Sequence, residues 1–154
     1  MYTASHPVSR ADFDNYYALR YAVLRKPWGH PPGSEKDEQE DSSVHAFIKE
    51  NNAVLAVCRL QLNSANTGQI RYMGVRPDMQ GKGLGKIIIS FLEKEAVNLG
   101  VNEIILHSRE NAVEFYKSCG YELVEKSYLM WGEIQHYLMR KNLLANNSFS
   151  NSKD

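Results

Sequence analysis

The sequence contains little cysteine, no excess of charge of either sign and no long apolar run. Its two cysteines, Cys58 and Cys119, have neither a metal-binding spacing nor a disulfide framework, so reduced thiols and no metal are expected. The 18 basic and 18 acidic residues give a formal net charge of zero, which leaves no overall field to attract nucleic acid or an anionic membrane. No run approaches the roughly 20 apolar residues that span a bilayer, and residues 1–9 lack the pattern of a signal peptide. We therefore expect a cytoplasmic protein without nucleic-acid or membrane partners.

The 154 residues suffice for one domain with a substantial core. We expect that domain over residues 1–144, followed by a polar, disordered Asn/Ser tail at 145–154. Hydrophobic spacing and turn residues predict a helix over 12–24, strands over 44–49, 53–62 and 69–75, a helix over 84–99, a strand over 103–106, a helix over 110–119 and strands over 121–130 and 133–140. A right-handed crossover places the strands at 69–75 and 102–107 side by side. The result is an α/β fold with a mixed sheet and helices on both faces.

Residues 80–86 read Gln-Gly-Lys-Gly-Leu-Gly-Lys and join a predicted strand to a predicted helix. Three glycines at alternate positions let a ligand approach the backbone, and the first amides of a helix have no partner within it. The segment therefore predicts an anion site. It is not a P-loop, because Ile87 stands where Ser or Thr is required, and not a dinucleotide loop, because Lys86 stands where the third glycine is required.

The spacing of Gln80, Gly83 and Gly85 fits the pattern Gln/Arg-x-x-Gly-x-Gly/Ala, which resembles the pyrophosphate loop of the GNAT superfamily of acyl-CoA-dependent N-acyltransferases. Three more segments are similar to motifs of that superfamily: residues 73–77, 111–121 and 134–139. In the segment at 111–121 the alanine comes one residue after the asparagine, which departs from the motif. Together the similar segments cover roughly residues 44–141.

The resemblance implies a GNAT-like fold with a six- to seven-stranded sheet, and acetyl transfer from acetyl-CoA to a primary amine by direct attack in a ternary complex. The residues implied to contact coenzyme A are Met73, Gly74, Val75, Gln80, Gly81, Lys82, Gly83, Leu84, Gly85, Lys86, Asn111 and Tyr116. The loop amides would hold the pyrophosphate. Residues 73–75 would bind the pantetheine arm as an added strand and offer an N–H to the thioester carbonyl, with Gly74 marking a bulge.

Alternatives to this activity are an acyltransferase that uses another acyl-CoA and a CoA-binding sensor or interaction module without turnover. The expected partner is a small-molecule or peptide amine. Homodimers are common in such folds, and nothing in this sequence demonstrates one.

Tyr116 is the predicted general acid, because matching tyrosines of the superfamily protonate the departing thiolate. A tyrosine with a pKa near 10 is a weak acid at neutral pH, but a thiol of pKa about 8–9 is an easy leaving group. The other interpretation of Tyr116 is a buried packing residue, as expected for its neighbour Phe115. Asn111 would either hold the cofactor or order the start of the helix.

The general base stays open, since a carboxylate, a histidine or a water chain could accept the proton of the amine. The candidates are Glu133 and His136 on the terminal strand, Glu38, Glu40 and Asp41 in the acidic loop, and His107 on the central strand. The acidic loop, residues 34–41, lies where the superfamily usually builds its acceptor pocket, and Arg20, Trp28 and His30 could shape that pocket. Its five carboxylates either favour a cationic amine or are simply solvated.

Overall fold

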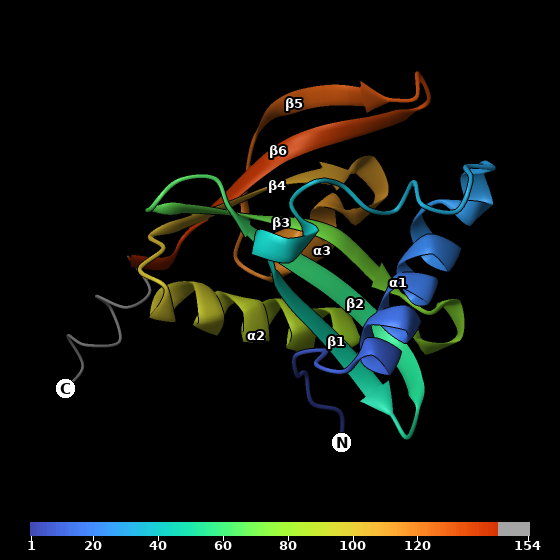
Figure 1. Ribbon diagram of the computed structural model, residues 1–154. Coiled ribbons are helices and arrows are strands. Elements are labelled where there is room, and N and C mark those ends of the chain that lie inside the picture. Colours follow the sequence, from blue (N-terminus) through green and yellow to red (C-terminus); the bar gives the residue numbers. More distant parts are fainter. Residues whose placement is uncertain (145–154) are drawn as a thin grey trace. The chain divides into compact units, whose positions relative to one another are not determined.

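The computed structural model describes residues 1–144, so the tail predicted at 145–154 lies outside the described residues. The order of helices and strands follows the sequence prediction and can be traced in Figure 1. The elements are α1 (Arg10–Leu24), β1 (Val44–Glu50), β2 (Ala53–Leu62), β3 (Thr67–Val75), α2 (Leu84–Asn98), β4 (Glu103–Arg109), α3 (Val113–Ser118), β5 (Glu122–Met130) and β6 (Ile134–Asn142). Among residues 1–144 no helix is both long and apolar enough to cross a membrane.

The strands form a six-stranded mixed sheet in the order β1-β2-β3-β4-β6-β5. β3 and β4 run parallel, which confirms the predicted neighbours, whereas β1–β2, β4–β6 and β5–β6 are antiparallel. The paired residues of β3 and β4 are Thr67–Gln69 and Glu103–Ile105, the first three residues of each strand.

The described chain divides into two compact units. The first unit comprises Met1–Gln61 and Arg71–Lys94, and the second comprises Leu62–Ile70 and the described residues from Glu95 onward. The first unit therefore contains α1, β1, all of β2 but its last residue, the second half of β3 and most of α2. The second contains β4, α3, β5 and β6. The single domain over residues 1–144 stays a prediction.

Helix α1 begins at Arg10, two residues before its predicted start, because Ser9 caps it. The Ser9 hydroxyl accepts the Asp12 N–H at 3.0 Å, and the Asp12 carboxylate accepts the Ser9 N–H at 3.4 Å. This reciprocal pair satisfies amides that the first turn of the helix leaves without partners. The helix buries Tyr16 against Phe47 of β1, which places α1 on the sheet of the first unit.

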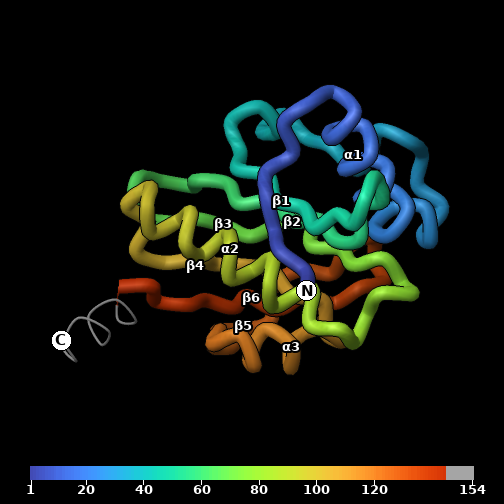
Figure 2. Tube along the Cα trace, turned by 90° about the horizontal axis from the view of Figure 1, so that it is seen from below, coloured from blue at the N-terminus to red at the C-terminus, as the bar shows by residue number. Residues whose placement is uncertain are grey.

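Strand β2 has eight consecutive buried residues, so both of its faces are covered within the protein. The segment before α1 adds a bridge between Ser5 and Phe47 that the sequence prediction lacked. Figure 2 shows this N-terminal segment passing β1 on its way to α1. The first unit therefore holds β1 between β2 and the start of the chain.

In β3, Tyr72 has a positive φ of +57° whereas Gly74 does not, and the bulge expected at Gly74 stays a prediction. A non-glycine residue with positive φ is strained and persists only where its surroundings hold it. Gly74 instead provides space, since a Cβ added there would lie 3.4 Å from Val23 Cγ1 and 3.6 Å from Val57 Cγ2. The absence of a side chain therefore lets α1 pack closely on β3.

Two predictions for the second unit are wrong in detail. The helix expected at 110–119 is a 3₁₀ turn over Glu110–Ala112 followed by α3, and neither start carries a side-chain cap, so Asn111 does not order the helix as an N-cap. Glu133 is exposed in a turn instead of lying on the terminal strand. The reason is that Trp131 and Gly132 take positive φ, and the Glu133 N–H donates to the Met130 carbonyl at 2.9 Å, closing the turn before β6 begins.

Candidate active site

The predicted anion loop, Gln80–Lys86, is hereafter the glycine loop, and its backbone is open toward solvent. Gly81 and Gly83 have φ +80° and +83°, and a Cβ added at either would meet no heavy atom within 4 Å. In the described part of the chain, the amides of residues 81–86 donate no hydrogen bond. A row of unpaired amides at the start of α2 can bind an anion through the backbone, and the helix dipole favours negative charge at the same place.

Hydrogen bonds at the end of β3 hold the glycine loop in place. The Gln80 amide nitrogen donates to the Val75 carbonyl at 3.3 Å, so this predicted cofactor contact braces the loop against the end of β3. The Arg76 N–H donates to the Leu55 carbonyl at 2.8 Å, which ties the loop to β2. Leu84 is buried at the other end, whereas Lys82 and Lys86 are exposed. The structure therefore brings the predicted residues 73–75 and 80–86 together at one end of β3.

A second polar site of the first unit is buried, and the sequence prediction missed most of it. Arg20 of α1 and Arg59 of β2 are both 0% exposed. The two guanidinium groups share the Glu40 carboxylate, at 2.9 and 2.8 Å, and Arg59 also forms a fork with Asp37 at 2.7 and 3.0 Å. A buried charge that has lost its contact with water needs an oppositely charged partner, and these carboxylates provide it for both arginines.

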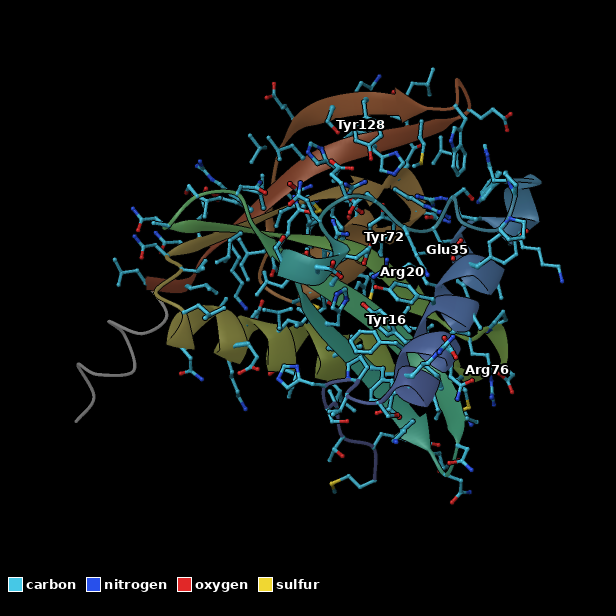
Figure 3. All side chains as sticks on the ribbon, viewed as in Figure 1. Tyr16, Arg20, Glu35, Tyr72, Arg76 and Tyr128 are labelled. Atoms are coloured by element: carbon cyan, nitrogen blue, oxygen red, sulfur yellow. The ribbon has the colours of Figure 1, made fainter. Side chains whose placement is uncertain are left out.

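Tyr72 and Arg71 of β3 complete this group. The guanidinium carbons of Arg20, Arg59 and Arg71 lie 4.3, 4.8 and 4.8 Å from the centre of the Tyr72 ring. The contacts suit cation–π attraction and hold the strained backbone of Tyr72 in place. Seven residues make up this group, which we call the Arg59 cluster: Tyr16, Arg20, Asp37, Glu40, Arg59, Arg71 and Tyr72. Figure 3 labels three of them, Tyr16, Arg20 and Tyr72, in one region of the molecule.

The Arg59 cluster fixes the ionisation of its members. Hydrogen bonding from Arg59 lowers the pKa of Asp37 to about 2, so this carboxyl is charged at neutral pH. Burial lowers the pKa of His45, whose Nε2–H donates to the Glu40 carbonyl at 2.7 Å, so His45 is neutral. Asp37 and Glu40 are therefore engaged inside the protein, and the buried Glu35 accepts the Gly33 N–H at 2.8 Å. Glu38 and Asp41 are exposed, as a solvated loop would have them.

One signal in the sequence could have revealed this site. Arg59 interrupts the apolar run Ala53–Leu62, and an arginine on a strand that is buried on both faces requires a carboxylate partner. Arg20, which the sequence analysis proposed only as a pocket residue, is a buried arginine with a carboxylate partner as well.

Trp28 and His30, the other two residues proposed to shape the pocket, lie in or just after a 3₁₀ turn, and the His30 carbonyl accepts the Tyr21 hydroxyl at 2.8 Å.

The second unit contains the predicted acid. Tyr116 of α3 is 7% exposed, and its ring lies 5.0 Å from Phe115 and 6.0 Å from Tyr121. Phe115, which was expected to be buried, is only half-buried, and Tyr116 is the more enclosed of the two aromatics. Asn111 is exposed in the preceding 3₁₀ turn.

Two of the base candidates, His107 and His136, meet around Tyr128 of β5. The His136 ring stacks on Tyr128, with centroids 4.5 Å apart and planes 8° apart, and His107 lies 5.3 Å from the same ring. The His136 Nδ1–H donates to the Ile134 carbonyl at 3.0 Å, which leaves Nε2 with its lone pair. Burial lowers the pKa of His136, and Arg109 and His107 lower it further, so the ring is neutral at neutral pH. Glu133, exposed in the turn, lacks such an arrangement.

Comparison with known proteins identifies the family. Residues 12–121 match the model of the acetyltransferase (GNAT) family. This chain belongs to the GNAT acetyltransferase family. It is 29% identical over 129 residues to an uncharacterised N-acetyltransferase of Bacillus subtilis, covering 84% of this chain and 91% of that protein. The family assignment makes it an acyl-CoA-dependent N-acyltransferase.

Solved structures share the fold. A structure from Lactobacillus plantarum superimposes with a TM-score of 0.81 at 23% identity, covering 92% of this chain and 98% of that one. An aminoglycoside 6'-N-acetyltransferase complexed with coenzyme A gives a TM-score of 0.77 at 14% identity, covering 91% and 96%. Among residues 1–144 no group of three or more His, Cys, Asp and Glu side chains could hold a metal ion.

Proposed function

We propose that this protein transfers an acetyl group from acetyl-CoA to a primary amine by direct attack in a ternary complex. The observation that carries the proposal is the glycine loop with unpaired amides at residues 81–86, within a chain of the GNAT acetyltransferase family. Those amides would hold the coenzyme A pyrophosphate, because they offer several donors and no Cβ at Gly81 or Gly83 obstructs the approach.

The pantetheine arm of acetyl-CoA would lie along residues 73–75 of β3. The pairing of β3 with β4 covers Thr67–Gln69, at the other end of the strand. Backbone groups of the later residues can therefore accept an added strand in the manner of β-augmentation. An amide N–H there would polarise the thioester carbonyl and so stabilise the charge that develops on its oxygen.

Tyr116 is the proposed general acid and His136 the proposed general base. His136 suits the second role because it is neutral, its tautomer is set by the Ile134 carbonyl, and its Nε2 can take a proton. The protonated amine loses one proton to the base, and the neutral amine then attacks the thioester carbon. The carbon–sulfur bond breaks as Tyr116 protonates the thiolate, and the nitrogen releases a second proton, which can return to the tyrosinate, to leave the neutral amide. Glu133 is the weaker candidate for the base, because it lies exposed in a turn.

Thiol release tests the proposed function directly. Purified protein is incubated with acetyl-CoA and a panel of primary amines, and free CoA thiol is measured against the background without amine. Amine-dependent release is expected. A protein that binds acetyl-CoA, seen as a raised melting temperature, yet never releases thiol above background would be a sensor and not an enzyme. Greater thiol release with another acyl-CoA would revise only the identity of the acyl donor in this proposal.

Two variants test the assigned roles. Tyr116→Phe should lower kcat by about tenfold to hundredfold with little change in acetyl-CoA affinity, whereas Tyr121→Phe, which removes a neighbouring hydroxyl, should not. His136→Gln should abolish the acidic limb of the pH profile of kcat/KM, since that limb reports protonation of the base. An acidic limb that persists in His136→Gln would assign the base to another group.

A further inference from the structure

Two carboxylates of the acidic loop, Asp37 and Glu40, are occupied by protein donors, so neither forms an open site for a cationic amine. Glu40 Oε2 accepts from Arg20, from Arg59 and from the Asp37 N–H at 3.1 Å, and Oε1 accepts from the Tyr17 hydroxyl at 3.2 Å. Both oxygens of Asp37 accept from Arg59. A substrate ammonium would have to displace buried guanidinium groups to reach either carboxylate, which would leave those charges uncompensated.

Arg71 is the solvent-facing cation of the Arg59 cluster. Its side chain is 35% exposed, and its hydrogen bond within residues 1–144 is one N–H to Asp37 Oδ2, at 3.3 Å. That oxygen also accepts from Arg59 at 3.0 Å and from the Tyr72 hydroxyl at 3.4 Å, so it has two other donors besides Arg71. A guanidinium has five N–H donors in a planar fork that matches a carboxylate. Most donors of Arg71 are therefore available to a ligand.

The surroundings hold Arg71 in place and leave the cluster rich in donors. Its guanidinium lies 4.8 Å from the Tyr72 ring, whose backbone is strained at φ +57°. Within residues 1–144, Nε of Arg20 and Nε of Arg59 are buried without a hydrogen-bond partner. Buried donors that lack acceptors are rare and call for an acceptor. The cluster therefore has a shortage of anionic oxygens and not a surplus.

Resting on the proposed function, we propose that the acceptor amine also carries a carboxylate, and that Arg71, oriented by Tyr72, binds it. Arg71 comes two residues before Met73 on β3, a rise of about 7 Å along a strand. The thioester is proposed to lie beside residues 73–75. An acceptor whose amine and carboxylate are a few bonds apart, such as an amino acid or a short acidic peptide, would bridge these positions. The acceptor class is thus the opposite of the polycationic amines that an acidic loop suggests.

Matched acceptors test the charge requirement. Amino acids and their carboxamides are compared as acceptors, together with a polyamine, by CoA thiol release. The wild-type protein should favour each carboxylate over its amide by about tenfold or more in kcat/KM, because a hydrogen bond from Arg71 to a charged oxygen is stronger than one to a neutral oxygen. Arg71→Gln should remove this preference by slowing the carboxylates alone, and Arg71→Lys should retain part of it. Arg140→Gln, which removes an exposed arginine elsewhere, is the control.

A binding experiment separates this proposal from the acetyl-transfer proposal. N-acetyl amino acids and their carboxamides are titrated into the protein saturated with free CoA, which requires no turnover. Tighter binding of the carboxylate, lost in Arg71→Gln, would support the acceptor class even if thiol release failed. Equal binding of acid and amide, or an Arg71→Gln variant that loses affinity for CoA itself, would each overturn it, as would a polyamine preferred over both in the thiol-release assay.

Discussion

The glycine loop and the Arg59 cluster are both polar sites of the first unit, and they are built in opposite ways. The loop takes all its residues from one stretch, 80–86, is exposed at most of them, and offers backbone amides. The cluster takes side chains from α1, the acidic loop, β2 and β3, and two of its arginines are fully buried. A change in the loop should therefore alter ligand binding, whereas a change in the cluster should alter the stability of the fold.

The largest effect is expected from Arg59→Gln. Removal of this guanidinium leaves the Asp37 and Glu40 carboxylates short of their charged partner, and breaking a buried pair costs about 3–5 kcal/mol. Urea denaturation should show this loss in the free energy of unfolding. Arg140→Gln, whose ion pair with Glu122 is exposed, should lose no more than about 1 kcal/mol. Equal losses in the two variants would contradict the contrast between buried and exposed charge.

The second-largest effect is expected from acid, which should remove the stabilisation of the folded state that Asp37 provides. Its folded pKa, about 2, lies below the ordinary value of 3.8, so the stabilisation is present above pH 4 and is lost as the pH falls from about 4 to about 2. The loss should be on the order of 2–3 kcal/mol. Denaturation across this pH range should show a steeper fall for wild type than for Asp37→Asn. Parallel curves would mean that Asp37 is not the group that titrates.

Gly83→Val should weaken binding of CoA by about 30-fold, or about 2 kcal/mol, with a smaller effect on unfolding. The added Cβ branch lies where the pyrophosphate would approach, and valine resists φ +83°. Gly100→Val is the matched control, since Gly100 has φ +84° and similar open space at the end of α2. Calorimetric titration with CoA gives the affinities. Wild-type affinity in Gly83→Val, or an equal loss in Gly100→Val, would remove the loop from the binding site.

The smallest effect is expected from Lys82→Gln combined with Lys86→Gln. Both lysines are exposed, so their attraction to a bound anion is screened by salt. CoA affinity should fall only about twofold to threefold at physiological ionic strength, and this difference should vanish in high salt. Titration at two salt concentrations measures it. A loss comparable to that of Gly83→Val would mean that side-chain charge, and not the backbone, holds the anion.

The sequence prediction was more accurate for the glycine loop than for the Arg59 cluster. The glycine loop, the parallel neighbours β3 and β4 and the order of elements were predicted, because each depends on residues close in the chain or on regular spacing. The positive φ of Tyr72 was not predicted, because it depends on guanidinium groups from α1 and β2 that surround the Tyr72 ring in space. Glu133 was misplaced for a local reason, since a closed turn at Trp131 and Gly132 displaced it from the strand.

The sequence by itself determined the family and the loop that would bind coenzyme A, because backbone recognition needs only glycines at the right spacing before a helix. The tertiary structure alone decided what the acidic loop does. A carboxylate that can reach a buried guanidinium is drawn to it, since each charge would otherwise stay unpaired away from water. Which carboxylates reach Arg20 and Arg59 depends on four segments meeting in space, and this decided that Arg71 is left facing solvent.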